Sequence, residues 1–144
     1  MIYNLPITTV QTAIYQLFKK AVDGYEVFDD STPHVDGETP PGHFMVIGPI
    51  SAQPQRAKVD SLLWKVSMTI DGYSNYQGKK KINEMLNDMV ILMTSSIYGL
   101  TFDGYELHDT IVEQVRVQAE DWNDGKIWQH GSVEVTLTLE QKEV

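Results

Sequence analysis

The stretch Ser61–Met93 has the clearest alternation of apolar and polar positions in the chain. Apolar residues fall on every second position at first, as Leu62, Trp64, Val66, Met68 and Ile70. Successive side chains of a strand point to opposite faces, so this pattern predicts a strand with one buried face. Apolar residues then recur at the period of a helix, as Ile82, Met85, Leu86, Met89, Val90 and Met93. The stretch therefore predicts a helix packed on a sheet.

The link between these two elements has its own signals. Asp71-Gly72 is typical of a turn. Ser74 and Gln77 have the spacing of a capping box, in which the serine oxygen accepts from the N–H of the glutamine, and the glutamine reaches back. We therefore expect the strand to end near Asp71 and the helix to begin soon after Ser74.

The rest of the chain predicts short elements separated by polar segments. Three prolines and two glycines make Asp30–Gly42 a flexible loop, and Ser51–Val59 is expected to be a polar connection. Glu113 interrupts the alternation of its strand, which indicates an edge or a bulge, and Asp124-Gly125 predicts a hairpin. The predicted elements are a helix at Ile7–Val22, strands at Tyr25–Asp29, His43–Ile50, Thr110–Glu120 and Lys126–Glu140, and a short strand near Leu100–Phe102.

Together these elements predict an α+β fold in the order α-β-β-β-α-β-β-β. Because the strands are apolar on one face, we expect a two-layer sandwich with two helices packed on one face of a mostly antiparallel sheet. A length of 144 residues fits a single domain over residues 1–144.

Composition excludes several classes of function. The chain has no cysteine, so disulfides and thiolate chemistry are excluded. No apolar run approaches the ~20 residues that span a bilayer, and the first residues lack a basic segment, so we expect a soluble protein that is not exported by a signal peptide. A net charge of −9, with Lys79–Lys81 as the one basic run, argues against specific nucleic-acid binding.

Candidate chemistry is sparse. One loop gathers histidines and carboxylates of the kind that bind metals, namely Asp30, His34, Asp36, Glu38 and His43. Their spacing fits no metal motif, so a solvated loop without a metal is the favoured interpretation. No Ser or Cys in a recognisable nucleophile motif accompanies His108 or His130, and no phosphate or cofactor motif is present. We therefore predict no catalytic residue and no cofactor, and hence no enzyme.

One pattern of elements resembles a known family. A helix and a Pro-containing loop precede a strand closing in Val46-Ile47-Gly48, a strand with Trp64, and a helix entered through Gly78. The chain then ends with Asp124-Gly125, His130-Gly131 and an alternating strand. This order resembles the tail completion proteins of long-tailed bacteriophages, which join tail to head and are similar in layout to tail terminators. The segment Asp71–Ser74 departs from the pattern, which expects a Trp-Ser or similar pair there.

The resemblance implies a structural virion protein, assembled in the host cytoplasm and located in the tail. Such proteins form a ring, commonly of about six copies, on the head-proximal end of the tail tube. The ring stops tube polymerisation and contacts the head connector, while genome DNA can pass through it. The implied partners are copies of the chain itself, the tail tube protein and the head connector protein. Candidate interface residues are Asp30, His34, Asp36, Glu38, His43, Arg56, Lys79 and Lys80.

Three alternatives stay open at this point. A small α+β binding module would use Met85, Met89 and Met93 as an apolar groove, although their helical spacing favours a place in the core. An enzyme would use the Asp30–His43 loop with a metal. A phage neck or connector protein shares the assembly role. The free chain is either a ring already or a monomer that assembles on the tube.

Overall fold

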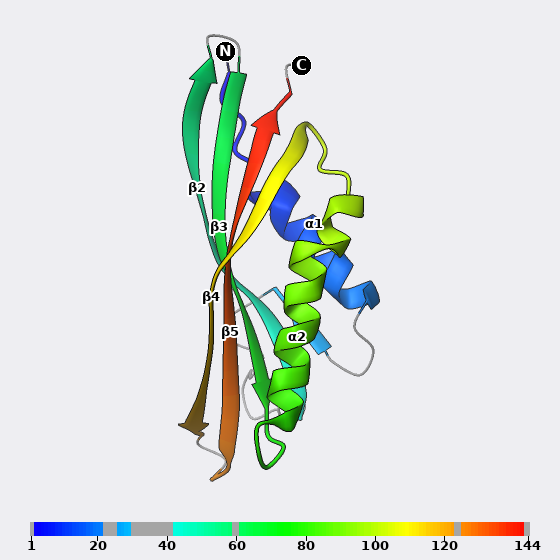
Figure 1. Cartoon of the computed structure of the whole chain (residues 1–144), viewed down its shortest axis with the longest axis vertical. Helices are drawn as coiled ribbons and strands as arrows, with labels where there is room; N and C mark the ends of the chain where they lie inside the picture. The colour runs from blue at the N-terminus through cyan, green and yellow to red at the C-terminus, as the bar shows by residue number, and fades with distance from the viewer. Residues whose placement is uncertain (1, 22–25, 30–41, 59–60, 123–124, 143–144) are drawn as a thin grey trace.

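The computed structural model describes residues 2–21, 26–29, 42–58, 61–122 and 125–142, which form one sheet covered by two helices on one face (Figure 1). The sheet order is β1-β2-β3-β5-β4, with β1–β2 parallel and the other pairs antiparallel. The elements are α1 (Ile7–Ala21), β1 (Glu26–Phe28), β2 (His43–Lys58), β3 (Ser61–Ser74), α2 (Lys80–Thr94), the 3-10 helix η1 (Ser96–Gly99), β4 (Tyr105–Asp121) and β5 (Ile127–Gln141).

The observed order α-β-β-β-α-β-β confirms the predicted α+β class and its two layers. The predicted hairpin is also confirmed, because β4 and β5 are antiparallel neighbours joined through Gly125, whose φ is +77°. The short strand expected near Leu100–Phe102 is wrong. That part of the chain follows η1, and Phe102 makes only an isolated bridge with Tyr105.

The prediction of a polar connection after Ile50 is also wrong, since β2 continues through it to Lys58. Ser51 pairs with Ser67, and the ladder continues to Arg56 opposite Leu62. β1 pairs with β2 only from Phe44 to Val46. The outer half of β2, from Ser51 to Lys58, therefore lies at the edge of the described sheet. Pro54 is tolerated there because an edge position requires no outward N–H.

The predicted capping box is not formed. β3 extends to Ser74, which is buried and lies 3.0 Å from Nδ1 of His43 through its Oγ. The same Oγ accepts a hydrogen bond from the N–H of Tyr76 at 3.2 Å. α2 begins later, at Lys80, without a side-chain cap. Among the described residues, no helix is both long and apolar enough to cross a membrane.

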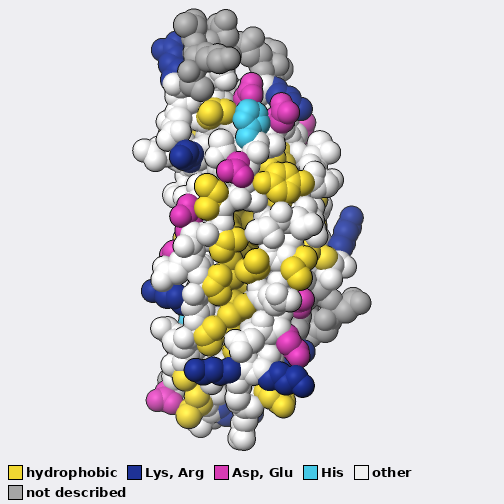
Figure 2. Space-filling view, viewed as in Figure 1, with side chains coloured by type: hydrophobic (Ala, Val, Ile, Leu, Met, Phe, Trp, Pro, Cys, Tyr) yellow, Lys and Arg dark blue, Asp and Glu magenta, His cyan; other side chains and the backbone are white. Residues whose placement is uncertain are grey.

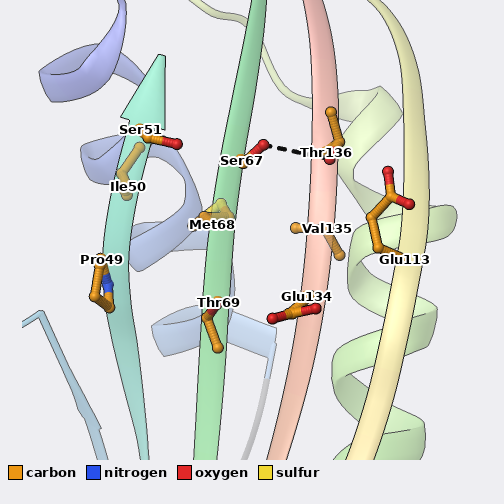
Figure 3. A pocket seen from close by; sticks show the side chains of 10 residues that line it. All are labelled: Pro49, Ile50, Ser51, Ser67, Met68, Thr69, Glu113, Glu134, Val135 and Thr136. Atoms are coloured by element: carbon orange, nitrogen blue, oxygen red, sulfur yellow. Dashed lines mark hydrogen bonds between the residues drawn. The ribbon is translucent and has the colours of Figure 1, made fainter. Parts of the chain in front are cut away.

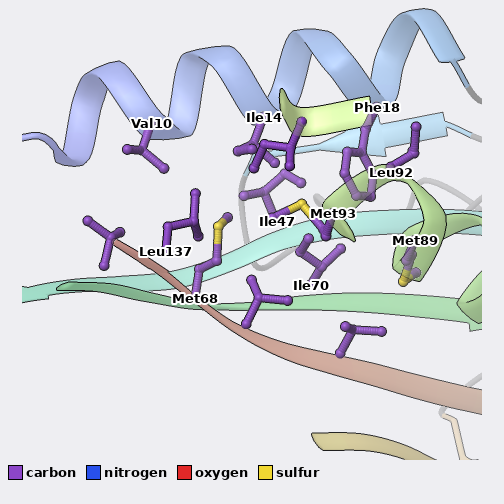
Figure 4. Packing of buried hydrophobic residues seen from close by; sticks show 14 of the residues in the cluster. Val10, Ile14, Phe18, Ile47, Met68, Ile70, Met89, Leu92, Met93 and Leu137 are labelled. Carbon is purple, nitrogen blue, oxygen red and sulfur yellow. The ribbon is translucent and has the colours of Figure 1, made fainter. Parts of the chain in front are cut away.

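The main core lies between the two helices and the sheet (Figure 4). Every second residue of β3 and β5 faces it, and both helices contribute one stripe. Met85, Met89 and Met93 have no exposed surface, which confirms their assignment to the core. Burial of one such side chain stabilises the fold by about 1.5–3 kcal/mol. Fully buried contributors include Val10, Ile14, Phe18, Val66, Ile70, Val133, Leu137 and Leu139.

Two glycines let α2 approach the sheet closely. A Cβ on Gly131 would lie 2.7 Å from Cδ2 and 2.9 Å from Cγ of Leu86. A Cβ on Gly72 would lie 2.6 Å from Cε of Met89. The methionine methyl group ends a flexible side chain and can move, whereas Leu86 presents its branch point. Gly131 therefore tolerates an added side chain less well than Gly72 does.

Gly131→Ala should destabilise the protein by about 1–3 kcal/mol, because the added methyl overpacks the contact with Leu86. Gly72→Ala should cost less, because Met89 can adjust its rotamer. Gly99→Ala is the matched control, since a Cβ added at Gly99 would meet no atom within 4 Å. Urea unfolding of the three variants gives the order directly. Equal midpoints for Gly131→Ala and Gly99→Ala would contradict the close packing of α2 on the sheet.

Candidate functional site

The sheet face opposite the helices carries a second, aromatic cluster. Phe44, Val46 and Trp128 are buried in it, with Phe28, Tyr73 and Trp122 packed around them. Trp122 and Trp128 stack at 4.0 Å between ring centroids, and Phe44 stacks on Tyr73 at 4.9 Å. This packing fixes the plane of the Tyr73 ring beside the polar residues of the same face.

His130 lies at the centre of an ion-pair network next to this cluster. Its Nε2 is 2.7 Å from Oδ1 of Asp71, and its Nδ1 is 2.5 Å from Oε1 of Glu120. The Tyr73 ring stacks on the imidazole at 4.4 Å with 12° between planes. The register explains the meeting, because Tyr73 and Gln118 are the direct neighbours of His130 on β3 and β4. The network therefore links three adjacent strands.

The two carboxylates set the charge of this site. Burial lowers the pKa of His130, but the hydrogen bonds and charges of Asp71 and Glu120 outweigh it, so the pKa is raised above its usual value. Burial, followed by the charges of Asp71 and Glu120, raises the pKa of Tyr73 to about 12. The site thus favours a protonated imidazole between two carboxylates, with a neutral tyrosine on its face.

The network contains a serine, the residue type of many catalytic nucleophiles, but no group that could activate it. Ser132 donates from Oγ to Oδ1 of Asp71 at 2.7 Å and lies 3.4 Å from Nε2 of His130. An activated serine requires a neutral imidazole nitrogen that can accept its proton. Here both ring nitrogens face carboxylates, so the imidazolium has no free lone pair. The geometry suits a stabilising ion pair rather than acid–base catalysis.

A shallow groove of about 340 Å³ crosses the same face farther along the strands (Figure 3). Its floor is polar, and Oγ of Ser67 lies 3.4 Å from Oγ1 of Thr136. Glu113 and Glu134 are the two charged residues of its lining. Two carboxylates without a nearby cation in the lining disfavour phosphate groups.

A third cluster joins Glu106, His108 and Glu140 at the start of β4. Their potential ligand atoms lie within 4.8 Å of one another, and Nε2 of His108 is 2.9 Å from Oε1 of Glu140. An imidazole with two carboxylates is a donor set that Zn²⁺ accepts. The exposed His108–Glu140 ion pair already accounts for the arrangement. A register shift between Leu107 and Asp109 places His108 in a bulge, which the sequence pattern does not reveal.

The candidate interface residues do not form one surface in the described part of the chain. His43 begins β2 and Arg56 lies near its far end, so roughly 40 Å of extended strand separates them. Lys79 and Lys80 are exposed at the start of α2. Burial, followed by the charge of the neighbouring Lys81, lowers the pKa of His43. Four further candidates lie outside the described residues, namely Asp30, His34, Asp36 and Glu38.

Comparison with known proteins places the fold. No protein-family model matches the sequence, and no curated protein matches it. A chain of the solved structure titled "Virion of native gene transfer agent (GTA) particle" is similar in fold, with a TM-score of 0.69 and 13% sequence identity. The match covers 96% of this chain and 99% of that chain. At this identity the likeness shows a shared fold, and it extends over nearly the whole of both chains.

His130→Gln should destabilise the protein, and more so at low pH. The native pKa of His130 is raised, so its contribution is fully present below the unfolded value near 6.5 and is lost as pH rises through the native pKa. We expect a cost of about 1–3 kcal/mol at pH 6, because Asp71 and Glu120 lose their shared partner. The unfolding free energies of the wild-type chain and the variant, measured from pH 6 to pH 9, show how the contribution of His130 declines.

His108→Gln is the matched control for this measurement. His108 also pairs with a glutamate, but both side chains are about 40% exposed, so solvent screens the pair. Its removal should change the unfolding free energy by less than about 1 kcal/mol. A His130→Gln penalty that grows with pH would contradict the doubly paired imidazolium.

Proposed function

We propose that this chain is a structural protein of a phage-like virion and forms a ring on the head-proximal end of the tail tube. The observation that supports this most strongly is the fold likeness to a gene transfer agent virion chain over 96% of this chain. The order of elements and turns that resembles phage tail completion proteins supports the same role independently. In this role the ring stops tube polymerisation and joins the tail to the head connector.

The architecture suits a ring subunit. A closed ring requires two different, complementary surfaces on each copy, because each copy contacts one neighbour on each side. The two edges of the sheet differ from each other. Its β4 edge is a 17-residue strand, whereas its other edge is formed by the short β1 and the outer half of β2. The partners that we propose are copies of this chain, the tail tube protein and the head connector protein.

The acidic groove supports passage of DNA through such a ring. Glu113 and Glu134 line the groove on the sheet face that has no helices. A wall of like charge repels the phosphate backbone, so a genome moving past it would not be held.

The alternative functions have less support from the residues. A binding module built on the methionines of α2 needs an open groove, but Met85, Met89 and Met93 are fully buried. The enzyme alternative relies on a loop that lies mostly outside the described residues. A neck or connector protein shares the assembly role with a tail-end ring, so an assembly experiment distinguishes the two.

Purified chain added to polymerising tail tube protein of the same particle should shorten the tubes. Mean tube length should fall as the ratio of this chain to tube protein rises, since each capped end stops growing. Electron microscopy of the tubes, with the chain carrying a gold label, measures both length and position. An unrelated acidic protein of similar size is the control. Unchanged tube length, or label along the tube wall, would contradict the proposed function.

A further inference from the structure

A pocket of about 650 Å³ lies at the end of the molecule where α2 begins. One wall belongs to the segment that joins β3 to α2, and the other to the start of β5 and the turn before it. Backbone hydrogen bonds hold both walls. The N–H of Asn75 donates to the carbonyl of Gly42 at 3.0 Å, and the N–H of Trp122 donates to the carbonyl of Lys126 at 3.1 Å. The pocket is therefore formed before a ligand arrives.

Carboxamide groups make up much of the polar lining of this pocket. Asn75, Gln77 and Gln129 each offer a carbonyl oxygen and an NH₂ group. Oε1 of Gln129 is buried and accepts no hydrogen bond, and it is the one such side-chain atom among the described residues. A buried acceptor without a donor lowers stability, so folded proteins seldom contain one without a use. The pocket therefore calls for a ligand that donates a hydrogen bond.

The rim of the pocket is basic, although the chain has a net charge of −9. Lys126 lies on the β5 wall, and three lysines follow directly after Gly78 on the other wall. Figure 2 shows Lys and Arg side chains close together at its lower end, where α2 begins in Figure 1. We call Lys79, Lys80, Lys81 and Lys126 the basic rim.

Helix stability does not explain the basic rim. Lys79 and Lys80 are exposed, and α2 has neither a capping side chain nor an acid in its first turn. Cations at this end of a helix oppose its dipole. A smaller hollow of about 180 Å³ shares Tyr76 with the pocket, and Glu84 is the one acidic residue in the described linings of both. A negatively charged ligand would therefore meet little repulsion here.

An acidic segment of polypeptide satisfies both features. Its carboxylates can pair with the lysines of the basic rim. Its backbone N–H groups can donate to Oε1 of Gln129. The phosphates and sugars of duplex DNA offer acceptors alone along the backbone, so DNA would leave Gln129 without a donor.

We propose that the pocket and its basic rim bind an acidic polypeptide segment. The source of the segment rests on the proposed function, in which this chain meets copies of itself and the tail tube protein. A second copy is a suitable source, because the chain is acidic outside the basic rim. The tail tube protein is the other.

The probe for this site is a short, fluorophore-labelled peptide of alternating Glu and Gly, whose binding is read from fluorescence anisotropy at low salt. Lys79→Gln/Lys80→Gln should weaken binding about fivefold, because two charge pairs are lost. Gln129→Met should weaken it about threefold, because a hydrogen bond is lost. Gln129→Met should leave the urea midpoint of the free chain unchanged or raised, since the acceptor has no partner there. A lowered midpoint with unchanged binding would overturn the proposal.

Lys19→Gln/Lys20→Gln is the matched control, since it removes the same charge from two exposed neighbours at the end of α1. It should change binding less than about twofold. A peptide of alternating Gln and Gly should bind about fivefold more weakly than the acidic peptide. Equal effects of the two lysine pairs would overturn the proposal. Tighter binding of a labelled DNA duplex than of the acidic peptide, lost in Lys79→Gln/Lys80→Gln, would also overturn it.

Sedimentation and the tail tube assay identify the source of the segment. Weaker self-association of Lys79→Gln/Lys80→Gln would assign the segment to a second copy. Unchanged self-association, with loss of tube shortening, would assign it to the tail tube protein. If the variant self-associates and shortens tubes as the wild-type chain does, the inference is overturned and the proposed function stands. Peptide binding by a wild-type chain that does not shorten tubes would support the pocket and contradict the proposed function.

Discussion

The structure depends on covering one apolar face of a sheet whose four long strands have 14 to 17 residues each. Strands of this length extend about 50 Å, whereas each 15-residue helix spans about 22 Å. α1 and α2 therefore cross the sheet at different places and cover different parts of it (Figure 1). The remaining apolar positions, above all those along β4, are left at the surface.

The face without helices is stabilised in another way. The aromatic cluster around Phe44 and Trp128 buries part of it, and the Asp71–His130–Glu120 network joins β3, β5 and β4 beside that cluster. Neither feature needs a second layer of helices. Because the rest of this face is mostly polar, it can remain in contact with water.

The sequence predicts those elements in which the period of apolar residues shows which side chains are buried. The alternation from Leu62 to Ile70 and the helical stripe of Ile82–Met93 identify β3 and α2 correctly, because burial repeats with the period of each element. The pattern does not reveal the outer half of β2, because Ser-Ala-Gln-Pro-Gln-Arg is held as a strand by its ladder with β3 rather than by an apolar face. The prediction for Ser74 is wrong because its hydroxyl serves a strand end beside His43 instead of a helix start.

The candidate site was even less predictable from the sequence, because strand register brings its residues together. Asp71, Glu120 and His130 lie on three strands, and a shift of one residue in any register would send one of them to the other face. His130 and His108 are visible in the sequence, but their carboxylate partners follow only from the strand pairing. The exposure of Val115 likewise follows only from the sheet order, in which β4 is the last strand of the described sheet.

The most direct measurement is the position of this chain in a complete particle. Electron microscopy of virion particles from the organism that makes it, labelled with an antibody raised against it, locates it on the particle. The account predicts a single site of label per particle, at the junction of tail and head, with several copies in a ring. Label spread over the head or along the tail, or particles that assemble fully without the chain, would contradict it.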